Sequence, residues 1–206
     1  FCQGPHTLRR LLAVGLGTMA FTMEDVLLEP FGGEILNLSV ADTTLLTATL
    51  ALGGLIGFAW ASRVLSRGTD AYRMAGWGAW VGVPAFAAVI ASAPLDSATV
   101  FALGVFLIGL GGGLFAHGTL TATMQLAPPE QIGLAMGAWG AVQATAAGVG
   151  MALGGLLRDA VALSSGSLLG YVSVYGLEII LLALTLWAVR PLQDFSAQAN
   201  ADSVSV

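Results

Sequence analysis

The sequence contains no lysine, one cysteine and two histidines, and only 9% of its 206 residues are charged. An ordinary water-soluble domain of this length needs far more charge on its surface, so the composition excludes that class. The lone Cys2 excludes an internal disulfide. The formal net charge of −5 comes without a large basic patch, which argues against a nucleic-acid partner.

What the sequence has instead is apolar length. Hydrophobic residues make up 56% of the chain, and its mean hydropathy is +0.85. Most of the 28 glycines lie inside the apolar runs, which is typical of membrane helices that pack closely through small residues. The short alternating strands of an outer-membrane barrel are missing. We therefore predict an all-α fold, a polytopic membrane helix bundle in a lipid bilayer.

Six apolar runs reach the roughly 20 residues that a helix needs to span a bilayer. They cover residues 8–28, 43–62, 72–93, 98–126, 132–157 and 168–189. We expect about six transmembrane helices in one bundle over residues 1–193, followed by a disordered cytoplasmic tail over 194–206. The chain begins at Phe1 without an initiator methionine, so we expect it to be part of a longer protein.

The arginines predict the orientation in the membrane. If the helices alternate in direction, Arg158 lies alone on one side, and the positive-inside rule places both ends of this chain in the cytoplasm. The arginines that share the other side are Arg9, Arg10, Arg63, Arg67, Arg73 and Arg190.

A polar stripe is predicted on the first span. Thr18, Thr22, Asp25 and Glu29 fall at i, i+4, i+7 and i+11, so a continuous helix would place them on one face among apolar side chains. Ionisable groups at that depth are unfavourable and usually functional. The stripe should therefore face protein, a ligand or trapped water.

His117 lies well inside the fourth run, with Gly113 and Thr121 on its face. A neutral imidazole is a good axial ligand for a metal or pigment centre, and a glycine one turn away would leave room for a flat ring. The alternative is a histidine that donates a hydrogen bond to a neighbouring helix. The residues themselves do not decide between these interpretations.

Four further side chains are candidates for a buried polar network, namely Glu24, Gln143, Arg158 and Glu178. Because Arg158 is the only cation on its side, pairing with Asp159, with Glu178 or with the Asp25 and Glu29 stripe would satisfy the most charge. The functional alternative is a carboxylate that titrates during proton-coupled transport. Both hypotheses stay open at this point.

The sequence shows no nucleophile-base-acid set, no phosphate-binding loop after a strand and no clustered Cys/His motif, so we do not expect an enzyme. Four glycine pairs have the small-xxx-small spacing that lets helices approach closely. These candidate contact pairs are Gly53 with Gly57, Gly109 with Gly113, Gly133 with Gly137, and Gly150 with Gly154.

Three long segments resemble the PucC/LhaA family of photosynthetic bacteria. They are the Glu-Asp-Val-Leu-Leu-Glu-Pro-Phe-Gly-Gly segment at 24–33, the Gly-Gly-Gly-Leu-Phe segment that leads to Gly-Thr-Leu-Thr at 111–121, and Gly-Ala-Trp-Gly-Ala-Val-Gln-Ala-Thr at 137–145. All three occur in the order of the family pattern. The resemblance covers nearly the whole chain, which looks like the C-terminal six of about twelve helices in a major-facilitator-like protein.

The resemblance implies a function. Members of this family are implicated in assembling light-harvesting antennae, by delivering bacteriochlorophyll to the antenna polypeptides in the inner membrane. It also implies that the first and fourth helices line a central cavity, so that the stripe and His117 would both face it, with His117 as a ligand of the pigment magnesium. The alternatives are a proton-coupled secondary transporter of the major facilitator type, and a scaffold for antenna complexes that has no ligand of its own.

Overall fold

The computed structural model describes residues 7–204, with side-chain surroundings for residues 7–193. Cys2 lies outside the described residues. Every element in the described part is a helix, as predicted. The elements are α1 (Thr7–Ala20), η1 (Glu24–Val26), α2 (Leu28–Ile35), α3 (Val40–Leu65), α4 (Ala71–Ser92), α5 (Ala98–Leu126), η2 (Pro129–Gln131), α6 (Ile132–Ser165) and α7 (Ser167–Val204).

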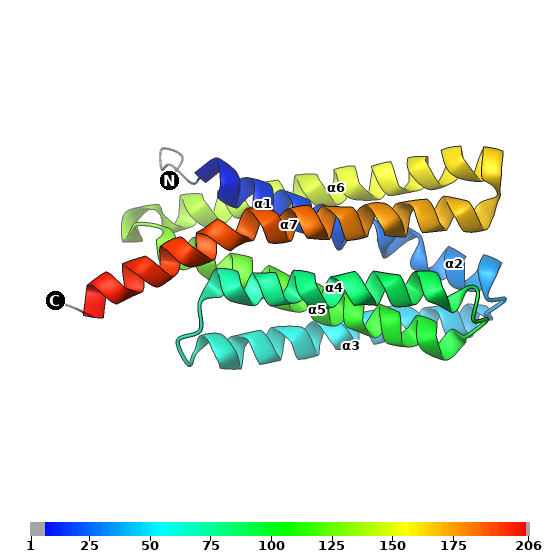
Figure 1. Ribbon diagram of the computed structural model, residues 1–206, viewed down its shortest axis with the longest axis horizontal. Coiled ribbons are helices and arrows are strands. Elements are labelled where there is room, and N and C mark those ends of the chain that lie inside the picture. Colours follow the sequence, from blue (N-terminus) through cyan, green and yellow to red (C-terminus); the bar gives the residue numbers. More distant parts are fainter. Residues whose placement is uncertain (1–6, 205–206) are drawn as a thin grey trace.

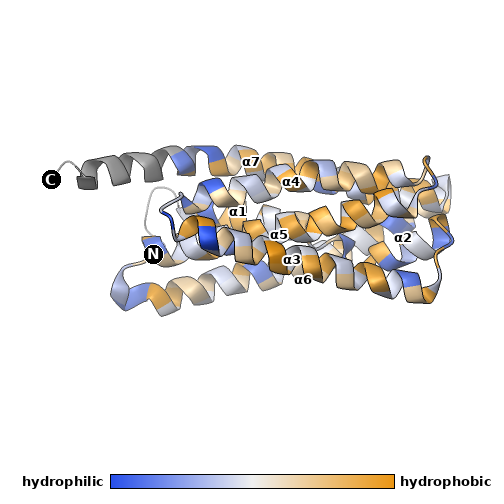
Figure 2. Cartoon of the chain, turned by 90° about the horizontal axis from the view of Figure 1, so that it is seen from below, coloured by the Kyte–Doolittle hydropathy of each residue, from blue (hydrophilic) through white to orange (hydrophobic). Residues whose placement is uncertain are grey.

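The long helices run side by side along one axis, and both ends of the chain lie at the same end of the bundle (Figure 1). Helices α1, α6 and α7 pack together as one group, and α3, α4 and α5 pack together as the other (Figure 1). Contacts between α4 and α7 join the two groups. Hydrophobic residues dominate the middle of the helices, and hydrophilic ones gather toward their ends and in the loops (Figure 2).

The number of spans agrees with the sequence. Five helices are long and apolar enough to cross a membrane, namely α3, α4, α5, α6 with η2, and the described part of α7. The segments Thr7–Val26 and Leu28–Ile35 pass the same test together, and they meet at an angle of 43°. The prediction of about six spans in an all-helical membrane protein is therefore confirmed.

The first span is broken, which the sequence analysis did not anticipate. Proline has no backbone N–H and clashes with the carbonyl four residues earlier, so Pro30 cannot continue a helix from Val26, although it fits the first turn of α2. In addition, Thr22 Oγ1 donates to the Thr18 carbonyl at 2.9 Å, a bond that often bends a helix. α1 ends at Ala20 and η1 follows it, and Pro30 prevents η1 and α2 from joining as one continuous helix.

Glycine contacts fix the lateral packing of α3 on α5. Gly53 and Gly57 lie against the carbonyls of Phe106 and Leu110, and Gly109 lies against the carbonyl of Leu50. A Cβ at any of these positions would collide with backbone. Of the other predicted pairs, Gly150 and Gly154 pack against Met19 and Met23, whereas Gly133 and Gly137 have nothing within 4 Å among the described residues.

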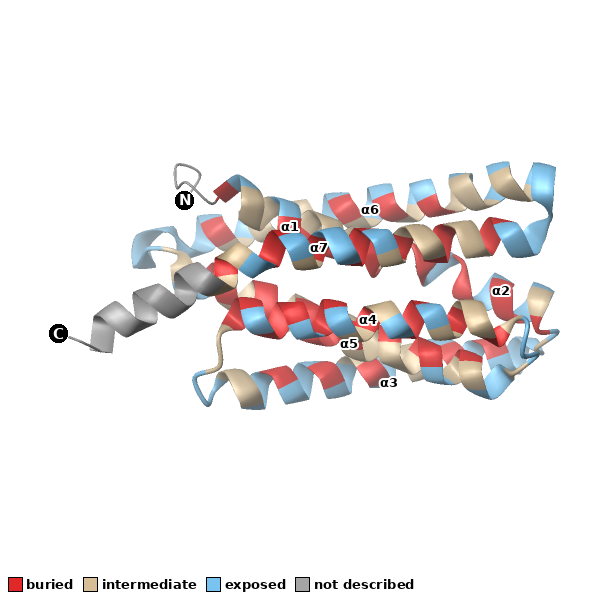
Figure 3. Ribbon diagram, viewed as in Figure 1, coloured by how far each residue is buried: buried red, intermediate tan, exposed pale blue. Residues whose placement is uncertain are grey.

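The two outer helices α3 and α6 expose long faces, as the burial colouring makes clear (Figure 3). Only 22% of the apolar window of α3 and 17% of that of α6 are buried, against 56% for α5. At the other end of the chain, the helical backbone of α7 runs to Val204, into the segment 194–206 that we expected to be a disordered tail. The side chains of that segment lie outside the described residues, so the division at residue 193 stays a prediction.

Candidate functional site

A groove of about 520 Å³ opens where α1, α3, α5 and α6 meet. We call it the threonine groove. Its lining residues are Thr18, Phe21, Thr22, Ala51, Gly54, Leu55, Phe58, Gly112, Gly113, Phe115, Ala116 and Gln143. The volume is in the range of small-molecule sites, which are concave and mostly apolar with a few polar groups.

The wall of the threonine groove combines flat apolar surface with three uncharged polar side chains. Three phenyl rings and three glycines supply the flat surface. Thr18, Thr22 and Gln143 supply hydroxyl and amide groups, and the Thr18 hydroxyl is buried without a hydrogen-bond partner among the described residues. None of the described residues that line the groove is charged, which suits a large neutral ligand.

The predicted polar stripe divides at the break in the first span. Thr18 and Thr22 face the threonine groove. Asp25 and Glu29 follow the turn out of α1, are exposed, and do not line it. The Glu29 carboxylate accepts a hydrogen bond from Thr47 of α3 at 2.6 Å. The expectation of one continuous stripe was wrong, because it assumed an unbroken helix through residue 29.

His117 lies on α5 beside the threonine groove but is not one of its lining residues. Its imidazole packs edge-on against Phe58 of α3, with ring centroids 5.0 Å apart. Nδ1 is buried and has no hydrogen-bond partner among the described residues. Thr121 follows one turn later and is half-buried. The imidazole is therefore not committed to the interhelical hydrogen bond that was the alternative interpretation.

Gly113 does not provide the predicted room beside His117. A Cβ at Gly113 would lie 2.5 Å from the Gly54 carbonyl oxygen, so the backbone of α3 fills the space that a flat ring would need. Gly112, one residue earlier, faces the groove, and the nearest atoms to its Cβ position belong to the Phe21 side chain at 3.6–3.9 Å. The open glycine surface is therefore at Gly112.

Arg158 pairs at the end of the bundle remote from the chain ends. Nη1 donates to Asp159 at 2.8 Å and Nη2 donates to Glu34 at 2.6 Å, and Nη2 also donates to the Tyr171 hydroxyl at 3.0 Å. The predicted pairing with Asp159 is confirmed. Pairing with Glu178 or with the stripe was wrong, because α2 brings Glu34 to the guanidinium instead.

The remaining network candidates lie in two separate places. Gln143 lines the threonine groove. Glu24 and Glu178, on η1 and α7, are fully enclosed with exposed fractions of 1% and 0%. The four candidates therefore form no single network. Among the described residues, no group of three or more His, Cys, Asp or Glu side chains could hold a metal ion.

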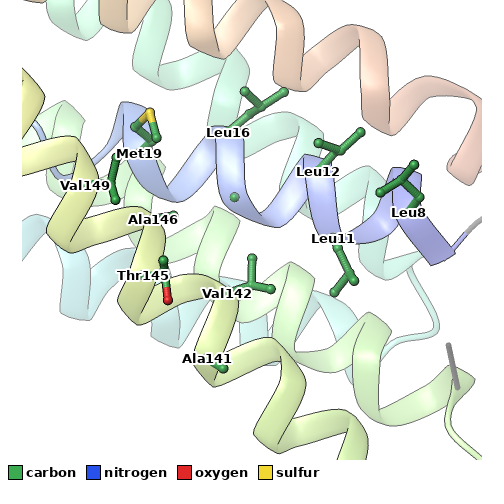
Figure 4. Close-up of a pocket in the computed structure, with 11 residues that line it drawn as sticks. Leu8, Leu11, Leu12, Leu16, Met19, Ala141, Val142, Thr145, Ala146 and Val149 are labelled. Carbon is green, nitrogen blue, oxygen red and sulfur yellow. The ribbon is translucent and has the colours of Figure 1, made fainter.

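A second groove of similar volume lies between α1 and α6 (Figure 4). We call it the leucine groove. Its walls are leucines of α1, from Leu8 to Leu16, facing small and β-branched side chains of α6, from Ala141 to Val149. Thr145 is its one hydroxyl-bearing lining residue, so this surface offers little beyond apolar contact.

Sequence reasoning missed two interactions that shape the groove region. The indole N–H of Trp139 donates to the Thr119 hydroxyl at 3.3 Å, which joins α6 to α5. Phe58 of α3 lies between His117 and the threonine groove. No local sequence pattern distinguishes Phe58. Trp139 belongs to the third segment of the family resemblance, at 137–145, and could have been singled out for that reason.

The family model described as PUCC protein matches residues 1–196 of this chain. Protein PucC of Rhodovulum sulfidophilum is 63% identical over 161 residues, covering 78% of this chain and 36% of the relative. Protein PucC of Cereibacter sphaeroides is 53% identical over 197 residues, covering 93% of this chain and 43% of the relative. The bacteriochlorophyll synthase 44.5 kDa chain of Rhodobacter capsulatus is 30% identical over 174 residues, covering 81% and 40%.

The chain thus spans about two fifths of the length of the curated relatives that it matches. The match reaches almost from end to end of the chain and includes all three segments singled out in the sequence. The helical membrane fold agrees with it. This chain belongs to the PucC family.

Proposed function

We propose that this chain is part of an integral membrane assembly factor for bacterial light-harvesting antenna complexes, one that binds bacteriochlorophyll and delivers it to the antenna polypeptides. It acts as a carrier and not as an enzyme. Its place is the bacterial inner, photosynthetic membrane, with both ends of this chain in the cytoplasm. The remainder of a longer protein completes the site, because the relatives are more than twice as long as the matched region.

The threonine groove is the observation that carries the proposal. A bacteriochlorin is a large, flat, mostly apolar ring with carbonyl groups at its edge. Phenyl rings and the exposed backbone at Gly112 suit the face of such a ring, and the hydroxyls of Thr18 and Thr22 with the Gln143 amide suit its carbonyls. The lack of charge among the described lining residues suits a neutral pigment.

His117 is the candidate axial ligand of the pigment magnesium. Its buried Nδ1 has no partner among the described residues, and neutral imidazole nitrogen is a suitable ligand. Phe58 stands between the imidazole and the groove, so ligation requires the Phe58 ring to turn aside.

The antenna polypeptides are proposed to meet the membrane-facing surfaces. The exposed faces of α3 and α6 are apolar over most of a membrane span. Antenna helices in the same bilayer can pack on such faces without leaving the lipid. The leucine groove adds a concave apolar surface beside α1.

The test is to fill the threonine groove with a larger side chain. Gly112→Leu places a side chain into the threonine groove with only the Phe21 ring nearby, so the fold should tolerate it. The matched control is Gly148→Leu, on α6, which has nothing within 4 Å among the described residues and lines neither groove. The full-length protein, purified gently from pigmented cells, is assayed for bound bacteriochlorophyll and for co-purifying antenna polypeptides.

We expect Gly112→Leu to lose most of the bound pigment and Gly148→Leu to retain it. Equal pigment content in both variants would remove the threonine groove as the site. Pigment-free wild-type protein that also lacks antenna polypeptides would overturn the proposed function as a whole.

The second candidate function is proton-coupled secondary transport. The carboxyl groups that could titrate during transport are those of Asp25, Glu29 and Glu178. Asp25 and Glu29 are exposed and lie outside the threonine groove. The buried Glu178 is the observation that favours this candidate. Solute uptake that depends on pH and is abolished by Glu178→Gln would support transport, and no pH dependence would speak against it.

A further inference from the structure

Two carboxyl groups meet in the interior at the break in the first span. Glu24 begins η1 and Glu178 lies on α7, and their side chains interact directly. If both were ionised, neither could donate a hydrogen bond. Among the described residues, Glu24 Oε2 and both carboxyl oxygens of Glu178 then form no hydrogen bond of good geometry, although the backbone N–H of Glu24 is directed at the pair.

Among the described residues, no cation forms an ion pair with either carboxyl group of this pair. The titratable groups that act on it are Asp25, the neighbour of Glu24 on η1, and Tyr175, one turn before Glu178 on α7. The rings of Phe31 from α2 and Phe86 from α4 enclose Tyr175. Arg158, whose guanidinium lies over the Tyr171 ring, is already bound by Glu34, Asp159 and Tyr171. Two buried carboxylates without a cation would be strongly unfavourable.

We propose that Glu24 and Glu178 are a proton-binding site. One carboxyl group stays protonated, and its O–H donates a hydrogen bond to the carboxylate of the other. The pair then carries one proton and a single negative charge, and the shared proton supplies the hydrogen bond that the unpaired oxygens lack. The proton belongs to the pair and not to either residue. This proposal is independent of pigment binding.

Tyr175 is a second observation that points to the same site. Its side chain is completely buried, and its hydroxyl has no hydrogen-bond partner among the described residues. It lies within electrostatic reach of Glu24, Glu178 and Tyr171. A buried hydroxyl that is left unpaired beside two carboxyl groups is explained if it hydrogen-bonds to the pair when the proton moves.

The tyrosines also mark a route to the surface. Tyr171 and Tyr175 are one turn apart on α7, and both rings pack edge-on against Phe31, with centroids 5.4 and 5.5 Å away. The Tyr171 hydroxyl accepts a hydrogen bond from Arg158, whose side chain is 21% exposed. The route proposed for proton exchange follows this face of α7, from the end at Tyr171, beside the partly exposed Arg158 side chain, past the Tyr175 hydroxyl to the pair.

The pair also connects to the threonine groove. Thr22 lines the groove, and Glu24 follows it by two residues on the inner side of the same break. The shared proton holds η1 against α7. Losing it would leave two anions in contact beside the break that carries Thr22.

The experiment is infrared difference spectroscopy on the full-length protein in lipid nanodiscs near neutral pH. A protonated carboxyl group has a C=O stretch that shifts in heavy water, whereas a carboxylate does not absorb there. We expect the wild type to show such a band and the double variant Glu24→Gln/Glu178→Gln to lose it, whereas each single glutamine variant, which leaves one buried carboxyl group, should shift it. Glu130→Gln, at an exposed carboxyl group of η2, is the control that should keep it.

Glu178→Asp guards against a glutamine variant that fails to fold, because it retains a carboxyl group and should shift the band without removing it. A wild type without the band, as expected if the pair held a metal cation in place of a proton, would overturn the proposal. So would an unchanged band in the double glutamine variant.

The route is tested separately with Tyr175→Phe. This variant should keep the band but exchange its proton for deuterium several-fold more slowly than the wild type. Unchanged exchange would overturn the route through Tyr175.

Discussion

Arg158 Nη2 donates to Glu34 at 2.6 Å, although the two residues are 124 positions apart. The bond joins α6 to α2, the short helix that follows the break in the first span. The guanidinium also lies over the Tyr171 ring, with its carbon 4.7 Å from the centroid. Arg158 therefore holds three elements together at this end of the bundle.

Replacing Arg158 should destabilise the protein more than replacing Glu34. Glu34→Gln should lower the free energy of unfolding by at most about 1 kcal/mol, because the Glu34 side chain is 47% exposed and exposed ion pairs contribute little. Arg158→Leu should cost about 1.5–3 kcal/mol, because it also removes the hydrogen bond to Tyr171. Unfolding in mild detergent with increasing denaturant measures both. Equal losses in the free energy of unfolding would mean that the hydrogen bond from Arg158 to Tyr171 does not contribute to stability.

Gly113→Leu should disrupt the packing of α3 on α5. The Gly54 carbonyl occupies the space that a side chain would need, so we expect the free energy of unfolding to fall by about 1–3 kcal/mol. Gly137→Ala is the matched control, since nothing lies within 4 Å of that position and alanine favours a helix by about 1 kcal/mol over glycine. Thermal unfolding followed by tryptophan fluorescence compares the two. A destabilised Gly137→Ala protein would reveal a partner at that face.

Trp139→Phe should separate packing from hydrogen bonding at the contact between α5 and α6. The lost bond to Thr119 predicts a decrease in stability of about 0.5–1.5 kcal/mol. Thr119→Val removes the acceptor, and the double variant should be less destabilised than the sum of the two single variants. Strict additivity would show that the bond contributes nothing to stability.

His117→Leu tests the proposed magnesium ligand. If Nδ1 ligates the pigment, its removal should weaken bacteriochlorophyll binding by at least about tenfold, the range seen when a metal ligand shell is disturbed. The absorption band of any remaining pigment should also shift. Full pigment content with an unchanged spectrum would leave His117 as a packing partner of Phe58.

Pro30→Ala should straighten the first span. With an N–H restored at position 30, the helix can bond back to Val26, and the 43° bend between the two segments should decrease. Spin labels at the exposed positions Leu12 and Gly33 measure the change as a longer distance between them. An unchanged distance would mean that the packing of α2 on α3, and not the proline, sets the bend.

The sequence alone determined the fold class and the number of spans. Both depend on the length and hydropathy of each run, which are local properties, because a bilayer requires each span to satisfy its own backbone. The family was also readable from three local segments. The Gly53 and Gly57 pair with Gly109 and Gly113 was predicted as a set of contact sites, since small residues at that spacing permit close approach.

The tertiary structure alone decided which side chains meet. The length of the first apolar run predicted one continuous helix, and it gave no sign that α1 would end at Ala20 and leave Asp25 and Glu29 outside the groove. The approach of Glu24 to Glu178 and of Glu34 to Arg158 depends on how each helix is rotated about its axis. Contacts between distant segments fix that rotation, such as glycine backbone against backbone, and the local spacing of the glycines does not say which helix each of them meets.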